Sequence, residues 1–497
     1  MRLGGGFSVQ RRLPRLGGGL LRLGETVRLP LAQGLICTLT SVSLGVALGL
    51  GTGVVVALSA LVTAATSFAV SFARPLWVFT ALLLALALIP TYAAPGVGPL
   101  LLIPGAVGLG LMAAALTARR FLARAADHMT AVDWAVLAFF ALMAISVAFS
   151  PRVEPPGFAR LCLLWLVPYL GARLAFHEQP KTHVLAGAFA ASGLVVLPFV
   201  LYEAATGTNP FLALTFNSTE AGVWAESISR FGELRPEAGF GHPISLSMFL
   251  TTAALLCLGM GVHADAGMAR RRWLVAAVGL GAAQALALSR TGWLMLCVGV
   301  GLLAMISPRG NARRRLGAVV LAVFLLLLSI SRFAPVDQVQ VVTGGSSGPN
   351  AELSNSGDYR QGLLERALEP GVLGAWGNAS NKVAPAVDRD NFATDNQYIN
   401  LADEWGLIPL GGFVLIPATL LYAAIITRRR GAVAVVPIAA LTNFVGIFFV
   451  AFITQQQVVI WVLVGASAGL LARCDGRALL TRPEQQGGIA APGLTDR

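Results

Sequence analysis

Charged side chains are scarce in this chain of 497 residues. Asp, Glu, Lys and Arg make up only 12% of it, whereas 56% of the residues are hydrophobic and the mean hydropathy is +0.73. Soluble globular proteins carry about 25% charged residues. The composition therefore excludes an ordinary soluble domain and predicts a polytopic membrane protein.

Cysteine and histidine are also too few, and too scattered, to build a metal centre. Four of the five cysteines fall within apolar runs, and the fifth, Cys474, follows the last run. The long polar loops contain none, which excludes a disulfide framework and a cysteine-based metal site. The five histidines show no ligand spacing. No metal ion and no cofactor is expected.

Long apolar runs, by contrast, are abundant. A bilayer core of roughly 30 Å needs about 20 residues of apolar helix, so the runs predict about fourteen membrane-spanning helices, with about twelve as the alternative count. The predicted fold class is all-α, a polytopic helical membrane protein. The predicted spans lie near residues 34–51, 54–72, 76–92, 98–116, 133–149, 158–175, 184–203, 243–263, 273–288, 291–307, 315–331, 406–427, 431–454 and 457–473.

The distribution of charge predicts the orientation of these spans. With the N-terminus in the cytoplasm, most of the 36 Lys and Arg residues fall on the inner side and most of the 24 Asp and Glu residues on the outer side. This is the sense of the positive-inside rule, and it places both termini in the cytoplasm. The pI of about 10.3 then reflects orientation in the bilayer and not nucleic-acid binding.

The same pattern divides the chain into a transmembrane domain and two tails. Residues 1–30 form a basic cytoplasmic tail that we expect to lie on anionic lipid. Residues 31–473 form the transmembrane domain, and residues 474–497 form a second cytoplasmic tail.

The predicted spans have almost no charge in their interiors. Proton- or ion-coupled transporters place ionisable groups at mid-membrane, so this absence counts against them. A transporter or flippase remains the alternative of a different class. Two long outer loops, 204–242 and 332–405, hold most of the outer ionisable residues. Long loops are usually functional, so we expect the chemistry at the outer boundary.

Two polar clusters precede or join predicted spans on that side. The segment "RFGELRPEAGFGHPISL" places Arg230, Arg235 and His242 just before a helix that begins at Pro243. One interpretation is that these side chains bind a ligand. The other is that the segment is an ordinary re-entry turn, in which the arginines are solvated and His242 only begins the helix. The segment "ALALSRTGWLML" places Arg290 in a short outer turn. It is either an interfacial anchor or a guanidinium fork for a phosphate.

Two further clusters lie in and after the second long loop. In "NSGDYRQGLLERALEPG" a short helix is predicted, with Arg360 on its apolar side and Arg366 off it. In "TDNQYINLADEWGLIPL" an amphipathic helix is predicted to lead directly into the span from Gly406. A capping box of Thr394 and Gln397 explains its start. It leaves unexplained the polar residues around it, which are Asp395, Asn396, Asp403 and Glu404.

Taken in order, these clusters resemble the O-antigen ligase and Wzy-type polysaccharide polymerase superfamily. The matching segments are "RPEAGFGHP", "LSRTGWL", "DYRQGLLERAL" and "DNQYINLADEWGLIPL", within residues 185–425. The resemblance implies a GT-C-like helical membrane fold with short helices in the long extracytoplasmic loop. It also implies metal-independent transfer of a glycan from undecaprenyl diphosphate to an acceptor hydroxyl.

The resemblance also implies roles for individual residues. The charge that develops on the departing diphosphate needs preorganised donors, and the candidates are Arg235, Arg290 and Arg360, with Arg230 as a weaker fourth. Ligases of the superfamily use a loop histidine as the base, and Asp395 occupies that position here. The remaining candidates bind substrate; they are His242, Asn396 and Glu404, with Tyr398 and Trp405 as a stacking surface.

The expected function is that of a polysaccharide polymerase in the bacterial inner membrane. It would join lipid-linked repeat units in exopolysaccharide or O-antigen biosynthesis. The alternative within the same chemistry is an O-antigen ligase that transfers the chain to a lipid A-core. The implied partners are an undecaprenyl-diphosphate-linked glycan, an acceptor glycan or lipid A-core, membrane lipid, a flippase and a chain-length regulator, with no nucleic acid.

Overall fold

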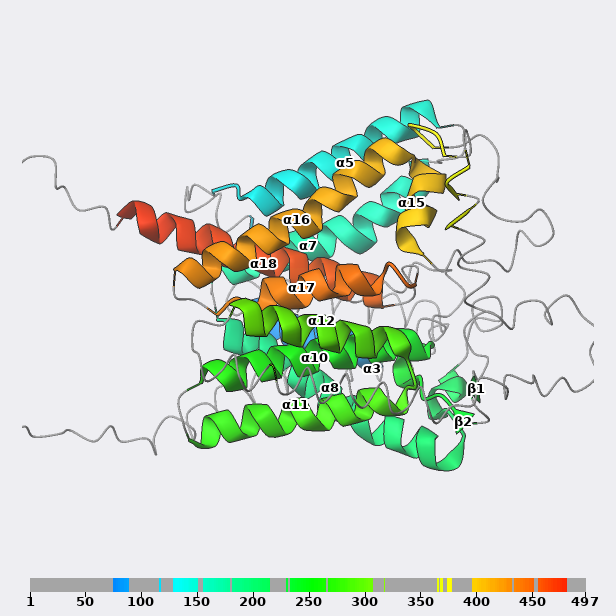
Figure 1. Ribbon diagram of the computed structural model, residues 1–497, viewed down its shortest axis with the longest axis vertical. Helices are drawn as coiled ribbons and strands as arrows, with labels where there is room; N and C mark the ends of the chain where they lie inside the picture. Colours follow the sequence, from blue (N-terminus) through cyan, green and yellow to red (C-terminus); the bar gives the residue numbers. More distant parts are fainter. Residues whose placement is uncertain are drawn as a thin grey trace, which may run out of the picture.

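A computed structural model of the chain shows a bundle of helices (Figure 1). It describes residues 75–88, 116–117, 128–150, 155–178, 181–214, 229–230, 233–264, 267–306, 317, 364–365, 367–369, 373–377, 396–430, 433–450 and 455–480. The predicted spans near 34–51, 54–72 and 315–331, most of the span near 98–116, and the basic tail lie outside these ranges.

The described elements are almost all helical. A two-stranded antiparallel ladder, β1 (Ser229–Arg230) with β2 (Glu233–Leu234), pairs Arg230 with Glu233. The helices are α3 (Pro75–Leu88), α5 (Ala131–Phe149), α6 (Pro155–Leu161), the π-helical turn η3 (Cys162–Leu166), α7 (Val167–Glu178), α8 (Thr182–Thr206), η4 (Pro210–Leu214), η5 (Ala238–Phe240), α10 (Pro243–His263), α11 (Met268–Leu286), α12 (Arg290–Ile306), α15 (Gln397–Trp405), α16 (Leu407–Arg429), α17 (Val435–Gly446) and α18 (Gln456–Leu480).

Six of the described helical segments are long and apolar enough to cross a membrane. They are Ala131–Phe149, Pro155–His177, Thr182–Thr206, Pro243–His263, Leu407–Arg429 and Gln456–Arg473. Shorter apolar helices are found in α3, α12 and α17. Each lies on a span expected from the sequence. The all-helical membrane architecture is therefore confirmed, while the total of about fourteen spans stays a prediction.

Two ends of the bundle can be distinguished (Figure 1). We call one the α15 end, because α15 and the β1–β2 ladder lie there, and α8 ends and α10 begins there. The opposite end holds two runs of arginine, Arg270–Arg272 at the start of α11 and Arg428–Arg430 at the end of α16. This separation follows the charge bias expected from the sequence.

The interior is packed with aromatic side chains and close helix contacts. Phe139 of α5 stacks against Trp165 with 6.2 Å between ring centroids and against Trp461 of α18 at 6.0 Å. α18 approaches α7 closely because it carries Gly465, where a Cβ atom would collide with the carbonyl oxygen of Tyr169. These contacts fix the helices that frame the α15 end.

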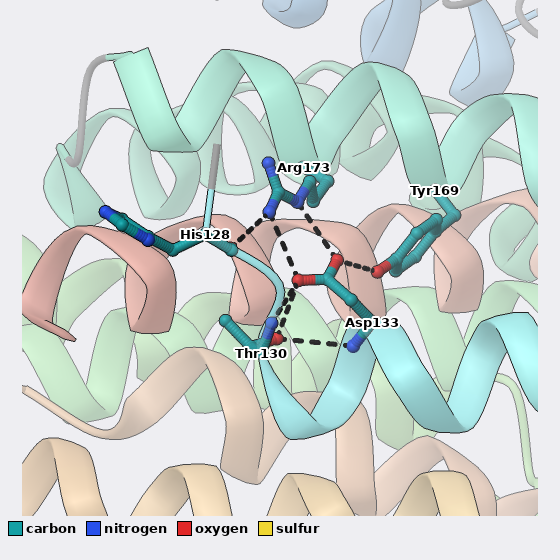
Figure 2. Close-up of polar contacts among 5 residues, drawn as sticks. All are labelled: His128, Thr130, Asp133, Tyr169 and Arg173. Atoms are coloured by element: carbon teal, nitrogen blue, oxygen red, sulfur yellow. Dashed lines mark hydrogen bonds and ion pairs between the residues drawn. The ribbon is translucent and has the colours of Figure 1, made fainter. Parts of the chain in front are cut away.

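A buried ion pair joins the start of α5 to α7 at the end opposite α15 (Figure 2), near the ends of the two spans and not in their middle. Arg173 Nε lies 3.0 Å from Asp133 Oδ1, and both side chains are about 95% buried, with 4% and 5% exposed. Thr130 donates to the same carboxylate from its backbone N–H at 2.7 Å and its hydroxyl at 2.9 Å. Tyr169 also donates to it, and Arg173 donates to the carbonyl oxygen of His128 at 2.8 Å.

Both oxygens of the Asp133 carboxylate accept hydrogen bonds in this cluster, and the Arg173 guanidinium donates to two different acceptor groups. A buried charge is tolerable only when it is paired and hydrogen-bonded, and the cluster meets that condition. It therefore ties α5 to α7.

Candidate functional site

The entry to α10 is built as the sequence predicts. His242 is the N-cap residue, and its Nδ1 accepts the backbone N–H of Ile244 at 3.2 Å, while Pro243 occupies the first turn. Proline suits this position because the amide hydrogen it lacks would have no helical partner. The interpretation of His242 as a helix-entry residue is thus confirmed, and its ring is held by the cap at the α15 end.

Arg235 connects this segment to the turn between α11 and α12. Its side chain is buried, with 6% exposed, and its Nε–H donates to the carbonyl oxygen of Ala287 at 3.1 Å. Arg290, the first residue of α12, follows that carbonyl by three residues and is exposed. Two of the three arginines proposed for the diphosphate thus belong to segments that touch each other.

The surroundings of His242 keep its ring uncharged. Burial lowers the pKa of His242 to about 3, and the positive charge of Arg235 acts in the same direction. A depressed histidine pKa means that a further positive charge is disfavoured there. The imidazole is neutral at physiological pH, so the cationic groups of this region are the arginines.

α15 lies against the end of α17 through backbone and side-chain hydrogen bonds. The backbone N–H of Gln397 donates to the carbonyl oxygen of Ile447 at 3.1 Å. The hydroxyl of Tyr398 donates to the backbone carbonyl oxygen of Phe444 at 2.9 Å. Asn396 is the N-cap residue and accepts the backbone N–H of Tyr398 at 2.9 Å. The helix therefore begins after Asn396, which corrects the expected capping box of Thr394 and Gln397.

The expected stacking surface on α15 also needs correction. Trp405 is only 1% exposed and its ring packs against Phe158 of α6, 6.1 Å between centroids. Tyr398 packs edge-on against Phe413 at 5.5 Å. Burial in the aromatic interior is more favourable for both rings than exposure at the boundary. Trp405 thus fixes α15 in place and offers no face to a sugar.

α15 does not continue into α16. Gly406, with φ of 103°, ends it, and α16 begins at Leu407. The first amides of α16 are capped by the loop segment Leu373–Gly377: Leu407 donates to Gly374 O at 2.9 Å and Ile408 to Ala375 O at 3.1 Å. Free N–H groups at a helix start need such partners. Part of the second long loop is therefore fastened beside α15.

Glu404 places a carboxyl group beside this junction. Although Glu404 is partly exposed, the protein around its carboxylate excludes enough water to raise its pKa, and the charge of Asp403 adds to this effect. A hydrogen bond involving Trp405 and the charge of Arg160 act in the opposite direction. The carboxyl group of Glu404 therefore holds a proton more readily than a fully solvated glutamate does.

Sequence reasoning missed two polar features that hold the α15 end together. Three consecutive buried glutamines lead into α18: Gln455 donates to Gly239 O at 2.8 Å, Gln456 to Asn443 Oδ1 at 2.5 Å, and Gln457 accepts from Trp165 Nε1 at 2.9 Å. The triplet "QQQ" at the start of an apolar run was the available signal. The second feature is Glu203 near the end of α8, fully buried.

Several predicted site residues lie outside the described residues. They are Arg360, Arg366, Asp395 and the side chain of Arg230. Among the residues that the structure describes, no group of three or more His, Cys, Asp or Glu residues is arranged to hold a metal ion. The described part of the site is therefore Arg235, Arg290 and His242 on one side, and α15 with Glu404 on the other.

Neither a scan against protein-family models nor a search of curated proteins finds a match for this chain. The buried guanidinium of Arg235 contacts the turn that precedes the exposed Arg290, and the capped α15 helix with Glu404 lies at the same end of the bundle (Figure 1). Guanidinium groups can bind anions.

Proposed function

We propose that the protein is a polysaccharide polymerase of the bacterial inner membrane. It transfers glycan repeat units from undecaprenyl diphosphate to an acceptor sugar hydroxyl at the outer face, with the α15 end facing out and a GT-C-like arrangement of about fourteen helices. The observation that carries the proposal is the hydrogen bond from Arg235 to Ala287, because it brings two arginine-bearing segments together.

The proposed reaction needs positive charge at that place. Cleavage of the anomeric C1–O bond leaves negative charge on the diphosphate, and preorganised donors stabilise that charge in the transition state. Arg235 and Arg290 supply donors from the described residues, and we assign Arg360 to the same group. A guanidinium is suited to this because its paired N–H groups match two phosphate oxygens.

The acceptor hydroxyl must lose a proton as it attacks C1. We assign this step to Asp395, with Asn396, Glu404 and the α15 surface holding the acceptor. Asn396 contributes mainly by capping α15. Glu404 places a second carboxyl group at the end of α15, where it can accept hydrogen bonds from the hydroxyl groups of the acceptor sugar.

Deletion of the gene tests the proposal directly, with surface glycans resolved on a gel. Single-repeat products would support the polymerase. Long chains stranded on the carrier lipid would show that the protein is the ligase acting on lipid A-core. Loss of all outward-facing lipid-linked units would show that it is a flippase and would overturn the enzyme.

A further inference from the structure

The α15 end contains a buried carboxylate, that of Glu203, which has no role in the reaction proposed above. Glu203 is 0% exposed. It lies in the last turn of α8, where the negative end of the helix dipole disfavours an acidic side chain. Burial of a carboxylate is itself unfavourable without strong hydrogen bonds. Both the helix dipole and the loss of water therefore destabilise the charged side chain of Glu203. Its hydrogen bonds offset this destabilisation.

The carboxylate of Glu203 holds the turn that leads into η5. It accepts the backbone N–H of Glu237 at 2.6 Å and the N–H of Ala238 at 3.0 Å and 3.1 Å through its two oxygens. The next peptide is held from another side, since Gln455 donates to Gly239 O at 2.8 Å. The backbone of residues 237–239 is therefore held both by α8 and by the residue that precedes α18.

The turn is held in an unfavourable conformation. Ala238 has φ of 47°, a region that residues with a side chain seldom occupy. Such residues persist only when surrounding contacts impose them, and they cluster at functional sites. Within the described part of the chain, the other non-glycine residue with positive φ is Leu288, at 46°. It directly follows Ala287, the residue that accepts the hydrogen bond from Arg235.

Arg235 links the two strained segments, because its backbone lies three residues before Ala238 and its side chain contacts Ala287, which precedes Leu288. It precedes Glu237 by two residues, so the turn that Glu203 holds determines where the Arg235 side chain begins. The far end of that side chain meets Ala287 O at 3.1 Å. A shift of the turn would move the guanidinium away from the α11–α12 turn that carries Arg290.

We propose that Glu203 is a positioning residue: its carboxylate holds the Glu237–Ala238 turn so that Arg235 is presented to a diphosphate group. The proposal rests on the proposed function, because the ligand is the diphosphate of the carrier lipid. Glu203 itself does not touch that ligand. It acts on binding only through Arg235.

The test is a double-mutant cycle on the full chain in detergent, with undecaprenyl diphosphate as the binding probe. Glu203→Gln keeps the shape of the side chain but presents an amide N–H₂ to the backbone donors. We expect it to weaken binding by roughly tenfold, and Arg235→Ala to weaken it at least as much. The double variant should bind no more weakly than Arg235→Ala alone, and Glu203→Asp should recover part of the affinity.

Amide hydrogen exchange supplies a second measurement that does not depend on the ligand. Glu203→Gln should speed exchange in the peptide that contains Glu237 and Ala238, with other peptides unchanged. Asp133→Asn is the matched control, since it removes a buried carboxylate at the opposite end. It should lower thermal stability and leave the affinity of the folded protein for the probe unchanged.

The outcomes separate the two proposals. Absence of probe binding by the unchanged protein overturns the proposed function, and the exchange measurement then shows whether Glu203 still holds the turn. If the unchanged protein binds and Glu203→Gln binds equally well, Glu203 does not position Arg235. Additive losses of affinity in the double variant would also overturn the positioning role of Glu203. Faster amide exchange throughout the chain would do the same, because both results indicate a general structural role.

Discussion

Arg235 and Ala287, 52 residues apart in the sequence, are joined by a hydrogen bond of 3.1 Å from the guanidinium Nε–H to the backbone carbonyl oxygen. The contact ties the segment before α10 to the turn before α12. The contact fixes the position of the guanidinium relative to the backbone of that turn. A positive group that is buried and oriented in this way is prepared for an anionic ligand.

Replacement of Arg290 tests whether the second arginine binds that anion. Arg290→Ala should lower polymer formation about 10²-fold or more, because the transition state loses a preorganised donor. Arg290→Lys should recover little, since an ammonium group cannot make the paired contact. Polymer length and amount are measured on a gel at matched protein levels.

Arg271→Ala is the control for that experiment. Arg271 is also exposed, but it belongs to α11 at the opposite end of the bundle. Its replacement should leave polymer formation unchanged. Normal polymer in Arg290→Ala would remove this arginine from the diphosphate site.

Gly406→Ala tests the junction between α15 and α16. Gly406 has φ of 103°, and a Cβ atom there would lie 2.5 Å from Ala375 O and collide with the backbone nitrogen of Gly377. The substitution should destabilise the protein by about 1–3 kcal/mol and loosen the segment Leu373–Gly377. Thermal unfolding in detergent and limited proteolysis measure the two effects.

A matched glycine lies in the same helix. A Cβ atom at Gly411 would meet nothing within 4 Å, and its backbone is helical. Gly411→Ala should therefore stabilise α16 by about 0.5–1 kcal/mol. Equal melting temperatures for the two variants would show that the close approach at Gly406 is unimportant.

Asp133→Asn tests the ion pair at the other end of the bundle. The change leaves Arg173 buried without its counter-charge, so we expect a loss of about 3–5 kcal/mol in the free energy of unfolding. The combined replacement Asp133→Leu with Arg173→Met should recover most of that loss, because no buried charge remains. Thermal unfolding of the two variants and the unchanged protein measures this. A double variant as unstable as Asp133→Asn would contradict it.

The sequence predicted the helices and their starting signals well. Proline after His242, the apolar face of α15 and most of the described spans follow from local patterns, which depend on neighbouring residues only. Such features are set by helix periodicity and capping. The break at Gly406 was missed because a glycine at the edge of an apolar run is equally compatible with a continuous helix.

Tertiary partners could not be predicted in the same way. Glu203 meets the backbone of Glu237, 34 residues later, and Asp133 meets Arg173, 40 residues later. In the sequence each reads as an isolated acid near the edge of an apolar run. Trp405 was assigned to a stacking surface for the acceptor sugar, yet the packing of α6 and α15 encloses it. These outcomes depend on how the helices assemble, which local pattern does not contain.

The pKa of His242 predicts how stability depends on pH. It is about 3 in the folded protein, against 6.5 for an unperturbed imidazole. Between these values the unfolded chain binds a proton that the folded protein does not, so stability rises with pH. The contribution of neutral His242 is complete above pH 6.5 and is lost progressively as the pH falls toward 3. Protonation would add a positive charge beside Arg235.

His242→Asn isolates this contribution. Asparagine keeps an acceptor for the N–H of Ile244 and is a preferred N-cap residue, so the helix start is preserved. We expect the variant to lose less thermal stability than the unchanged protein between pH 6.5 and pH 4, by an amount on the order of a few kcal/mol at most. Melting temperatures measured in detergent across this range provide the comparison. Parallel pH profiles for the two proteins would mean that His242 is as readily protonated in the folded state as in the unfolded chain, and that Arg235 exerts no repulsion on it.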